Sequence, residues 1–595
     1  MDKYSINQQS INTLLTWVES GQVAIPEIQR PFVWSKTQVR NLMDSLYQGY
    51  PVGYIITWQN PDVKLKDGTT SVGKKILIDG QQRITALRAA VGGLPILNKQ
   101  YKTENVAIAF NPQTEEFNTR TPAIERSREW ISDISKVMST GFDTYSFIEE
   151  YAERNSSVNK SEISRRINSL INIRNKQIGE IQLSQQLDIE VVNEIFVRIN
   201  ASGVNLSNAD FAMSKIAVYE KELGDEFGMK LRKFIDYFCN LAVAPEQYRH
   251  IENNDTEFAK TPYFNKIAWL KNDADNLYDP TYNDILRVVS LTHFGRGKLS
   301  DLVALLAGRD FETRENLKEV ADQSFQKLEA GVYEFTNQNN FQHFVQDILR
   351  GAAFDDVSML NARNAVNYAY AVYLRLRAIG EDPAEIDTLV RRLFVISLLT
   401  ARHSGSFETR FQDDIKRLNH PGDLRKLVET LEEQDLPEVF WRLTLPDEFD
   451  KTNTTNAFWQ VFIAAQKKLR KQSFLTDIEV YKMTTGDIHH IFPKNYLVKN
   501  GFDKSEYNKI ANFVFLRNDV NIKISDKEPR DYISQIENGG AFGSSIKTLA
   551  TMQQNFADNA IPETLRGATF KDYHDFLRQR RELMAELVHE YYYSL

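Results

Sequence analysis

The hydrophobic pattern changes twice along the 595 residues, and this constrains the fold more than any single motif. Short helical and strand-like patterns alternate up to about residue 230, long helical patterns dominate from about 231 to 450, and strands and helices mix again after that. A chain of this length exceeds what one hydrophobic core can hold. We therefore predict a mostly helical, multidomain α+β protein with domains 1–230, 231–450 and 451–595.

The composition indicates folded domains and narrows the chemistry. Hydrophobic residues make up 42% of the chain and aromatic residues 11%, which supplies enough apolar surface for globular domains. The single cysteine, Cys239, excludes a disulfide framework and a cysteine-based zinc site, as expected in a reducing compartment. The chain start lacks a signal-peptide pattern and the longest apolar run is too short to cross a bilayer, so we predict a cytoplasmic protein without a membrane partner. The net charge of −8 argues against a nucleic-acid coat over the whole surface, although a local basic cleft remains compatible.

Two helices and two strands are well marked in the first region. Apolar residues at helical spacing predict a helix from Ile11 to near Gly21. A second helix starts after Ser35, where Gln38 can complete a capping box, and ends at Gly49. The segments "GYIITW" and "KKILIDG" have the β-branched and apolar composition of buried strands, and the second leads into the helical "RITALRAAV".

The C-terminal region contains "GDIHHIFP", with His489 and His490 adjacent in a chain that has nine histidines. In a strand, alternation gives one buried and one outward histidine, so the pair alone is compatible with a purely structural role. Asn512 follows on the apolar, strand-like run "NFVFL", and Asn521 comes later, entering the next helix. The polar residues therefore come in the order His-His, Asn, Asn within a strand-loop-strand-helix context.

These residues resemble an HNH nuclease with a ββα-metal site, and more narrowly the C-terminal domain of GmrSD-type restriction proteins, over roughly residues 458–595. The resemblance implies that His489 and Asn521 bind one divalent metal ion, Mg²⁺ or Mn²⁺. It further implies that His490 is the general base and that Asn512 orients it. The chemistry agrees, because a neutral imidazole can take a proton from water while a cation stabilises charge on the phosphate.

Other polar residues near this motif have open roles. Asp487 can add a metal ligand or contact one of the ligands. Basic side chains around the motif can neutralise DNA phosphates, although such charges more often form only a solvated face. These residues are Lys494, Lys499, Lys504, Arg517, Lys523 and Lys527.

A second motif, "ILIDGQQRITAL", places Asp79 and Gly80 at the end of a strand and Arg83 in the first turn of a helix. The free N–H groups of a helix start favour an anion, and a glycine lets the backbone approach it closely. Arg83 can bind phosphate oxygens, and Asp79 can hold a metal ion or position water. The alternative is an ordinary strand-to-helix turn with a surface arginine.

Together with "IPEIQRPFVW", this motif resembles the GmrS-like, ParB/sulfiredoxin-like α/β domain at the N-terminus of the same proteins, with coverage to about residue 215. The resemblance implies a nucleotide-binding, NTPase domain in which Asp79 and Arg83 belong to the hydrolytic motif. The implied nucleotide contacts are Gln29, Arg30, Asp79, Gly80, Gln81, Gln82 and Arg83. The sequence does not distinguish GTP, ATP and CTP.

Two further segments stay open at the level of sequence. The segment "EIFVRINASGVNLSNADF" places polar groups before a helix that begins after Ser207, with Asp210 three residues on, and serves either nucleotide binding or the structure of the loop. The residues of this segment that precede the helix and could serve the nucleotide are Arg198, Asn200 and Gly203. The segment Arg402–Arg410, which includes His403, either contacts DNA or caps helices.

The combined architecture resembles single-chain, GmrSD-type type IV restriction enzymes. The resemblance implies an HNH endonuclease that cleaves or nicks modified, double-stranded phage DNA in antiviral defence under the control of a nucleotide. A homodimer is compatible with this reading. The alternative is a ParB-like, nucleotide-gated DNA-binding clamp or sensor without nuclease activity. The DNA modification that is sensed cannot be read from a short motif.

Overall fold

The computed structural model divides the chain into two compact units, Met1–Ala274 (unit 1) and Asp275–Leu595 (unit 2). The structure describes residues 3–20, 22–24, 32, 34–58, 75–97, 103–139, 141–155, 158–184, 187, 195, 207–217, 219, 227–315, 317–452, 455–483, 488–538 and 549–595. Helices dominate both units and the sheets are small, which confirms the predicted mostly helical α+β class. The division into three domains stays a prediction.

Unit 1 contains a five-stranded mixed sheet and two short hairpins. The strands are β1 (Tyr4–Ser10), β2 (Val23–Ala24), β3 (Tyr54–Trp58), β4 (Lys75–Asp79), β5 (Ile96–Leu97), β6 (Thr103–Glu104), β7 (Ile108–Asn111), β8 (Glu116–Thr119) and β9 (Gln177–Leu183). The sheet has the order β1-β9-β3-β4-β2, in which β3 pairs antiparallel with β4 and parallel with β9. The side chains of Ile55, Ile56 and Trp58 are all buried, as expected for a central strand covered on both faces.

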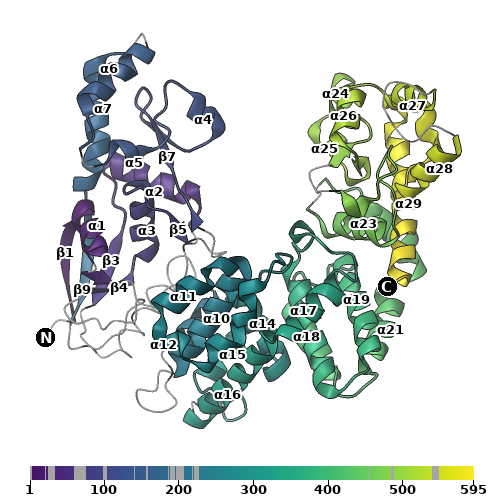
Figure 1. The fold of residues 1–595 in the computed structure, drawn as a ribbon, viewed down its shortest axis with the longest axis horizontal. Coiled ribbons are helices and arrows are strands. Elements are labelled where there is room, and N and C mark those ends of the chain that lie inside the picture. Colours follow the sequence, from purple (N-terminus) through teal and green to yellow (C-terminus); the bar gives the residue numbers. More distant parts are fainter. Residues whose placement is uncertain are drawn as a thin grey trace. The chain divides into compact units, whose positions relative to one another are not determined.

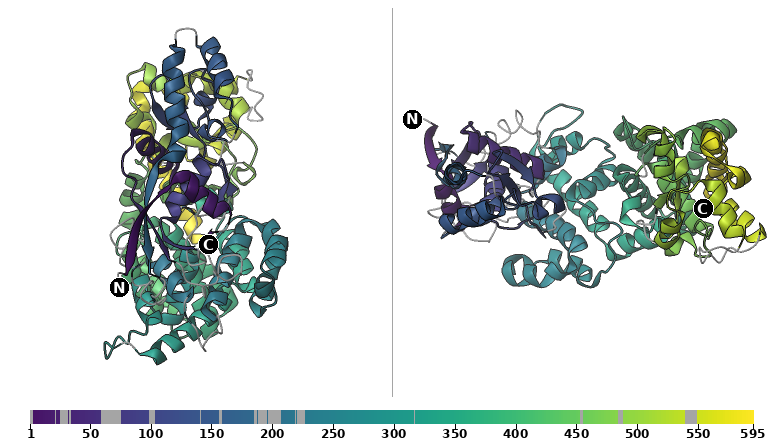
Figure 2. Two further views of the ribbon diagram at one scale, coloured as in Figure 1. Left: turned by 90° about the vertical axis from the view of Figure 1, so that its left-hand side faces the viewer. Right: turned by 90° about the horizontal axis from the view of Figure 1, so that it is seen from above.

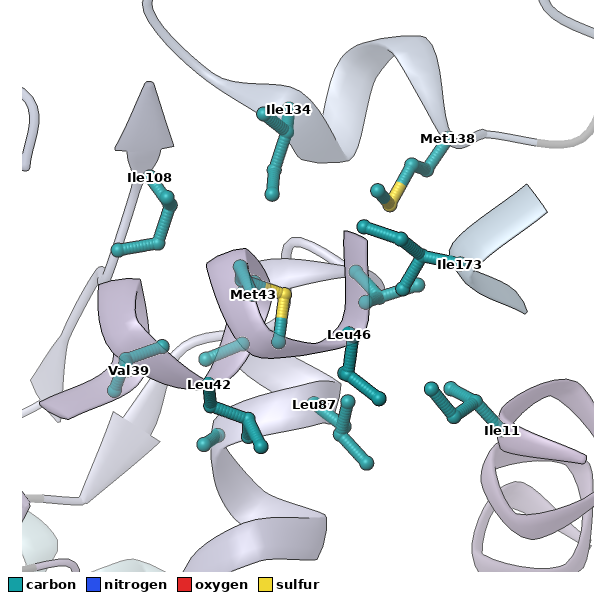
Figure 3. Packing of buried hydrophobic residues seen from close by; sticks show 14 of the residues in the cluster. Ile11, Val39, Leu42, Met43, Leu46, Leu87, Ile108, Ile134, Met138 and Ile173 are labelled. Atoms are coloured by element: carbon teal, nitrogen blue, oxygen red, sulfur yellow. The ribbon is translucent and has the colours of Figure 1, made fainter. Parts of the chain in front are cut away.

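Helices cover one face of this sheet and form the main core of unit 1 (Figure 1). The helices of unit 1 are α1 (Ile11–Glu19), α2 (Lys36–Gln48), α3 (Gln81–Ala90), α4 (Pro122–Arg126), α5 (Ile134–Val137), α6 (Thr144–Arg154), α7 (Lys160–Ile171), η1 (Asn172–Asn175), α9 (Asn208–Ala217), α10 (Phe227–Val243), η2 (Pro245–Gln247), α11 (Tyr248–Asn254), α12 (Thr256–Ala259), α13 (Pro262–Ile267) and η3 (Ala268–Asn272). Figure 3 shows Leu42 and Leu46 of α2 packed toward Leu87 of α3 and Ile11 of α1. A smaller apolar cluster that includes Trp58 lies on the other face of the sheet.

The local signals of the first region form as predicted. The Ser35 hydroxyl accepts from the Gln38 backbone N–H, and the Gln38 side chain accepts from the Ser35 backbone N–H, so the capping box is confirmed. Helix α2 ends at Gly49, whose φ of 77° lies in the left-handed region that favours glycine. The predicted helix from Ile11 is α1, which the Ser10 side chain caps.

Unit 2 begins with helices and ends with a mixed region. Its helices before residue 450 are α14 (Tyr282–Phe294), α15 (Leu299–Leu306), α16 (Lys318–Phe335), α17 (Gln338–His343), η4 (Phe344–Leu349), η5 (Val357–Met359), α18 (Arg363–Ile379), α19 (Pro383–Leu399), α20 (Phe407–Arg417), α21 (Asp423–Asp435), η6 (Phe440–Thr444) and α22 (Leu445–Glu448). Later come α23 (Ala457–Lys468), η7 (Val480–Lys482), β10 (Ile488–His490), α24 (Lys494–Lys499), α25 (Lys504–Tyr507), η9 (Ile510–Asn512), β11 (Phe513–Phe515), α26 (Asn518–Ile524), α27 (Pro529–Glu537), α28 (Leu549–Asp558), η10 (Glu563–Gly567), η11 (Phe570–Asp572) and α29 (Tyr573–Tyr593). The long helix α29 packs along α23 (Figures 1 and 2).

Within the described ranges, no helix combines the length and the hydropathy that crossing a bilayer requires.

Candidate functional site

Strands β10 and β11 form an antiparallel pair, and α26 begins shortly after β11. His489 lies opposite Val514 in the ladder and His490 lies opposite Phe513. The short helices α24 and α25 fill the connection between the strands. The structure therefore contains the predicted strand-loop-strand-helix order, which we call the ββα unit (residues 488–524).

The His490 ring lies against aromatic side chains, with its centroid 4.7 Å from that of Phe513 and 6.0 Å from that of Tyr507. Its Nε2 atom is buried and has no hydrogen-bond partner among the described residues. Burial lowers the pKa of His490 to about 4, opposed by a hydrogen bond with the Asn508 side chain and assisted by the nearby charges of Lys494 and His489. The imidazole is thus neutral at neutral pH, with one nitrogen available to accept a proton.

Asn512 is fully buried, and its amide makes three hydrogen bonds to backbone groups. Its Oδ1 accepts from the Phe492 N–H at 2.9 Å, and its Nδ2 donates to the carbonyls of Phe492 (3.2 Å) and Tyr507 (3.0 Å). These bonds tie Phe492, two residues after the end of β10, to Tyr507 at the end of α25. Asn512 therefore holds the loop around His490, while Asn508 contacts the imidazole itself.

The His489 side chain reaches α26 rather than the aromatic cluster. Its Nε2 lies 2.9 Å from Oδ1 of Asn518, the first residue of that helix. Asn521 is partly exposed and lies three residues further along α26. Because side chains at this spacing share one face of a helix, it lies on the same face as Asn518. The two histidines thus face different neighbours, as alternation along a strand requires.

Sequence reasoning missed Asn508 and Asn518. The roles of both depend on contacts with β10 that no local spacing encodes. The one available signal was the three-residue step from Asn518 to Asn521, which places two amides on one face of the predicted helix.

The donor set of the ββα unit is compatible with a hard divalent ion. Among the described residues, no group of three or more His, Cys, Asp or Glu side chains forms a metal cluster. The imidazole of His489 and the amides beside it nevertheless offer one nitrogen and neutral oxygens, a set that suits Mg²⁺ or Mn²⁺ with remaining water ligands. Asp487, the further ligand considered above, lies outside the described residues.

A buried cation from the C-terminal helix supports the same loop. Arg580 of α29 is fully buried, and its Nη1 donates to the carbonyls of Ala511 and Phe513, both at 2.7 Å. Its Nη2 donates to the Asn559 carbonyl at 3.3 Å. Burial lowers the pKa of Arg580 to about 9, so the guanidinium stays charged at neutral pH. The backbone on both sides of Asn512 is therefore clamped by a charged donor.

Several of the predicted phosphate-binding cations have local partners. Lys499 pairs with Asp526, and Arg517 pairs with Asp519 at 2.9 Å. Lys494 lies over the Tyr507 ring at 5.7 Å and lowers the pKa of His490. The basic surface around the ββα unit is therefore partly neutralised by neighbouring carboxylates.

The second predicted motif forms the predicted strand-to-helix turn. Gly80, between β4 and α3, has a φ of 95°. A Cβ added there would lie 2.7 Å from Cγ2 of Ile55 on the adjacent strand, so both the conformation and the space require glycine. In the described part of the chain, no side chain caps the start of α3. The first-turn N–H groups therefore keep the arrangement expected of an anion site.

Arg83 folds back toward β3. Its Nη1 donates to the Tyr54 carbonyl at 2.6 Å, while its Nε is buried and has no acceptor among the residues described. Gly53 makes room for it, because a Cβ there would lie 3.0 Å from the Arg83 Nη2. Burial lowers the pKa of Arg83, and the charge of Asp79 opposes that shift. Arg83 is thus held beside the turn, near Asp79.

The remaining predicted nucleotide contacts divide into two groups. Gln81 and Gln82 lie in the first turn of α3 and are partly exposed. Gln29 and Arg30 lie outside the described residues, as do Arg198, Asn200 and Gly203. The cap that follows is present: the Ser207 hydroxyl donates to Asp210 at 2.8 Å and accepts from the Asp210 N–H at 3.2 Å.

A buried carboxylate that the sequence did not reveal lies in the same sheet. Glu180 of β9 is fully buried and accepts from Lys75 (2.8 Å), Thr57 (2.7 Å) and Gln9 (3.0 Å) on neighbouring strands. Burial raises the pKa of Glu180, but these hydrogen bonds outweigh it and hold the pKa below its ordinary value. The Lys75 ammonium also lies 4.7 Å from the centre of the Trp17 ring. This network fixes the register of four strands.

The segment Arg402–Arg410 makes internal contacts. Arg402 Nη2 donates to both oxygens of buried Asp414, at 2.9 and 2.7 Å, and Asp414 also accepts from Tyr368 at 2.8 Å. Arg410 donates to the Ser404 carbonyl at 2.8 Å. These bonds favour the structural reading of the segment over a DNA contact.

Two comparisons with known proteins bear on these sites. Residues 11–217 match the family model of the GmrSD restriction endonuclease, N-terminal domain. The chain is also 21% identical over 590 residues to a protein of Methanocaldococcus jannaschii named "Uncharacterized protein MJ0686", covering 92% of this chain and 89% of that protein. Residues 11–217 are thus similar to the N-terminal domain of that endonuclease, and the name of the relative adds no activity.

Proposed function

We propose that the chain is a modification-dependent restriction endonuclease that cleaves or nicks double-stranded phage DNA at the ββα unit. The observation that carries the proposal is the buried, unpartnered Nε2 of the neutral His490, held among Asn508, Tyr507 and Phe513. The match of residues 11–217 to the N-terminal domain of a restriction endonuclease supports DNA as the substrate.

In this proposal His490 accepts a proton from the attacking water. The base must be neutral and correctly placed, and burial keeps the proton off the ring. Asn508 would orient the ring, and the backbone bonds of Asn512 hold the loop that follows His490. His489 and Asn521 would hold a divalent ion, Mg²⁺ or Mn²⁺, which when bound stabilises charge on the phosphate and the leaving oxygen.

The N-terminal turn is proposed to bind the phosphates of a nucleotide and to control cleavage. The support is the uncapped start of α3, the glycine at position 80 and the placement of Arg83 beside Asp79. The N–H groups of Gln81 and Gln82 would receive an anion there. GTP, ATP and CTP are all candidates, and Gln29 and Arg30 are proposed as further contacts.

The experiment compares the wild type with His490→Ala on modified and unmodified phage DNA, with Mg²⁺ or Mn²⁺ and with each nucleotide. We expect metal-dependent cleavage by the wild type and none by the variant, because the proton acceptor is lost. Cleavage by His490→Ala at the wild-type rate would reject the assignment. If the wild type binds DNA and nucleotide but never cuts, the chain is instead a nucleotide-gated clamp or sensor.

A second variant tests the N-terminal site. Arg83→Ala should lose nucleotide binding and any hydrolysis, and with them the nucleotide dependence of DNA cleavage. The matched control is Arg120→Ala, because Arg120 is an exposed arginine of the same unit that pairs with Glu125 at the surface. Unchanged nucleotide binding by Arg83→Ala would remove the turn from the proposal.

A further inference from the structure

The contact between His489 and Asn518 has the dimensions of a metal-ligand pair. The two facing atoms, the imidazole Nε2 and the amide Oδ1, lie 2.9 Å apart. Both atom types bind cations in proteins. Ligands of octahedral Mg²⁺ lie about 2.0–2.1 Å from the ion, and neighbouring ligand atoms at right angles are then about 2.8–3.0 Å apart. The observed separation therefore matches one edge of the coordination octahedron.

Helix α26 brings a second amide to the same place. Asn518 and Asn521 are three residues apart, and side chains at this spacing share one face of a helix. One imidazole from β10 and two amides from α26 would occupy one side of an ion and leave the opposite side to water and phosphate oxygens.

The charge of this donor set favours a phosphate substrate. An imidazole and two amides are neutral, so a divalent ion bound by them keeps its full positive charge. Negatively charged phosphate oxygens would then complete its coordination. Carboxylate ligands would instead neutralise the positive charge of the ion before the substrate binds.

The geometry points to Asn518 as a third protein ligand of the divalent ion in the ββα unit, alongside His489 and Asn521. This inference rests on the proposed nuclease function and adds a residue to it. In the contact described, with Oδ1 as acceptor, the proton of a neutral His489 is on Nε2. Metal binding requires the other tautomer, with the proton on Nδ1, so no proton is released to solvent when the ion replaces the hydrogen bond.

Mn²⁺ binding to the full chain, measured from the electron paramagnetic resonance signal of free Mn²⁺, tests the inference without relying on activity. The variants are Asn518→Ala, Asn518→Asp and His489→Ala, and Asn538→Ala is the control because Asn538 is an exposed asparagine at the end of α27. We expect Asn518→Ala to weaken Mn²⁺ binding at least about tenfold. Asn518→Asp should bind at least as tightly as the wild type, since a carboxylate oxygen replaces the amide oxygen. The control should not change.

The outcomes separate this inference from the function on which it rests. If His489→Ala abolishes Mn²⁺ binding and Asn518→Ala leaves it unchanged, Asn518 is not a ligand and the nuclease proposal stands. If the wild type binds no Mn²⁺ with or without DNA, both fail. A tenfold loss of Mn²⁺ affinity in Asn518→Ala supports the ligand role when the variant unfolds at the same temperature as the wild type. If Asn518→Ala loses both Mn²⁺ binding and folding, and Asn518→Asp does not restore binding, the ligand role is overturned.

Discussion

Replacing Asn512 by alanine should loosen the loop around His490 rather than remove a catalytic group. The substitution leaves three buried backbone groups unpaired: the N–H and carbonyl of Phe492 and the carbonyl of Tyr507. Each such group costs about 1–3 kcal/mol, although a water molecule in the vacated space can satisfy part of the deficit. We therefore expect a loss of about 3–6 kcal/mol in the local free energy of unfolding, which is large for a single substitution.

Hydrogen exchange measured by mass spectrometry suits this test, because a chain with two compact units does not unfold in one step. Peptides that cover the loop on both sides of Asn512 should exchange faster in the variant, while peptides of unit 1 should not change. Asn500→Ala is the matched control, since Asn500 is partly buried and its side chain makes one bond, to the Tyr496 carbonyl at 2.8 Å. In that control the local free energy of unfolding should fall by about 1 kcal/mol.

The refuting result is specific. If Asn512→Ala shows wild-type exchange around the loop and yet loses DNA cleavage, Asn512 acts directly on the base or the substrate, and the reading from its backbone bonds is wrong. If the variant exchanges faster but still cleaves in the cold, where the loop is mostly closed, the structural role is supported.

Three further perturbations have expected outcomes. Arg580→Met leaves the two carbonyls that flank Asn512 without their charged donor. The local free energy of unfolding should fall by about 2–4 kcal/mol, and hydrogen exchange in the loop should become faster. A variant as stable as the wild type would contradict the role of Arg580. The folded-state pKa of Glu180 lies below its ordinary value, so its contribution to stability is complete above about pH 4.5 and falls as the pH drops further. In urea unfolding, Glu180→Gln should be less stable than the wild type at pH 7. The difference between their free energies of unfolding should become smaller in acid. Gly80→Ala forces a Cβ against Ile55 at a φ of 95° and should destabilise unit 1 by more than about 1 kcal/mol in thermal unfolding, whereas an unchanged melting temperature would exclude the close approach.

Features encoded over a few residues were predictable from the sequence. The capping box of Ser35 and Gln38, the end of α2 at Gly49 and the turn at Gly80 each depend on side chains and backbone angles within one short segment. The order of strand, loop, strand and helix around His489 was likewise visible as a change of hydrophobic period.

Features that depend on contacts between distant segments were not predictable. The buried Glu180 appears in a strand pattern as an ordinary surface glutamate, and only pairing with other strands reveals that Lys75 and Thr57 satisfy it. Asn508 and Asn518 stand among several polar residues in the C-terminal region, and only the fold brings them to the two histidines. Asn512 was identified from its position, but its bonds to the backbone required the structure.

The Arg580 clamp has a consequence for how the molecule is made. Strands β10 and β11 leave the ribosome well before α29, and domains fold progressively as the chain is synthesised. Until Arg580 emerges, the carbonyls of Ala511 and Phe513 lack their charged donor, so the loop around His490 stays unsupported. Translation products that stop short of this residue would therefore carry the histidine pair without the framework that orders it.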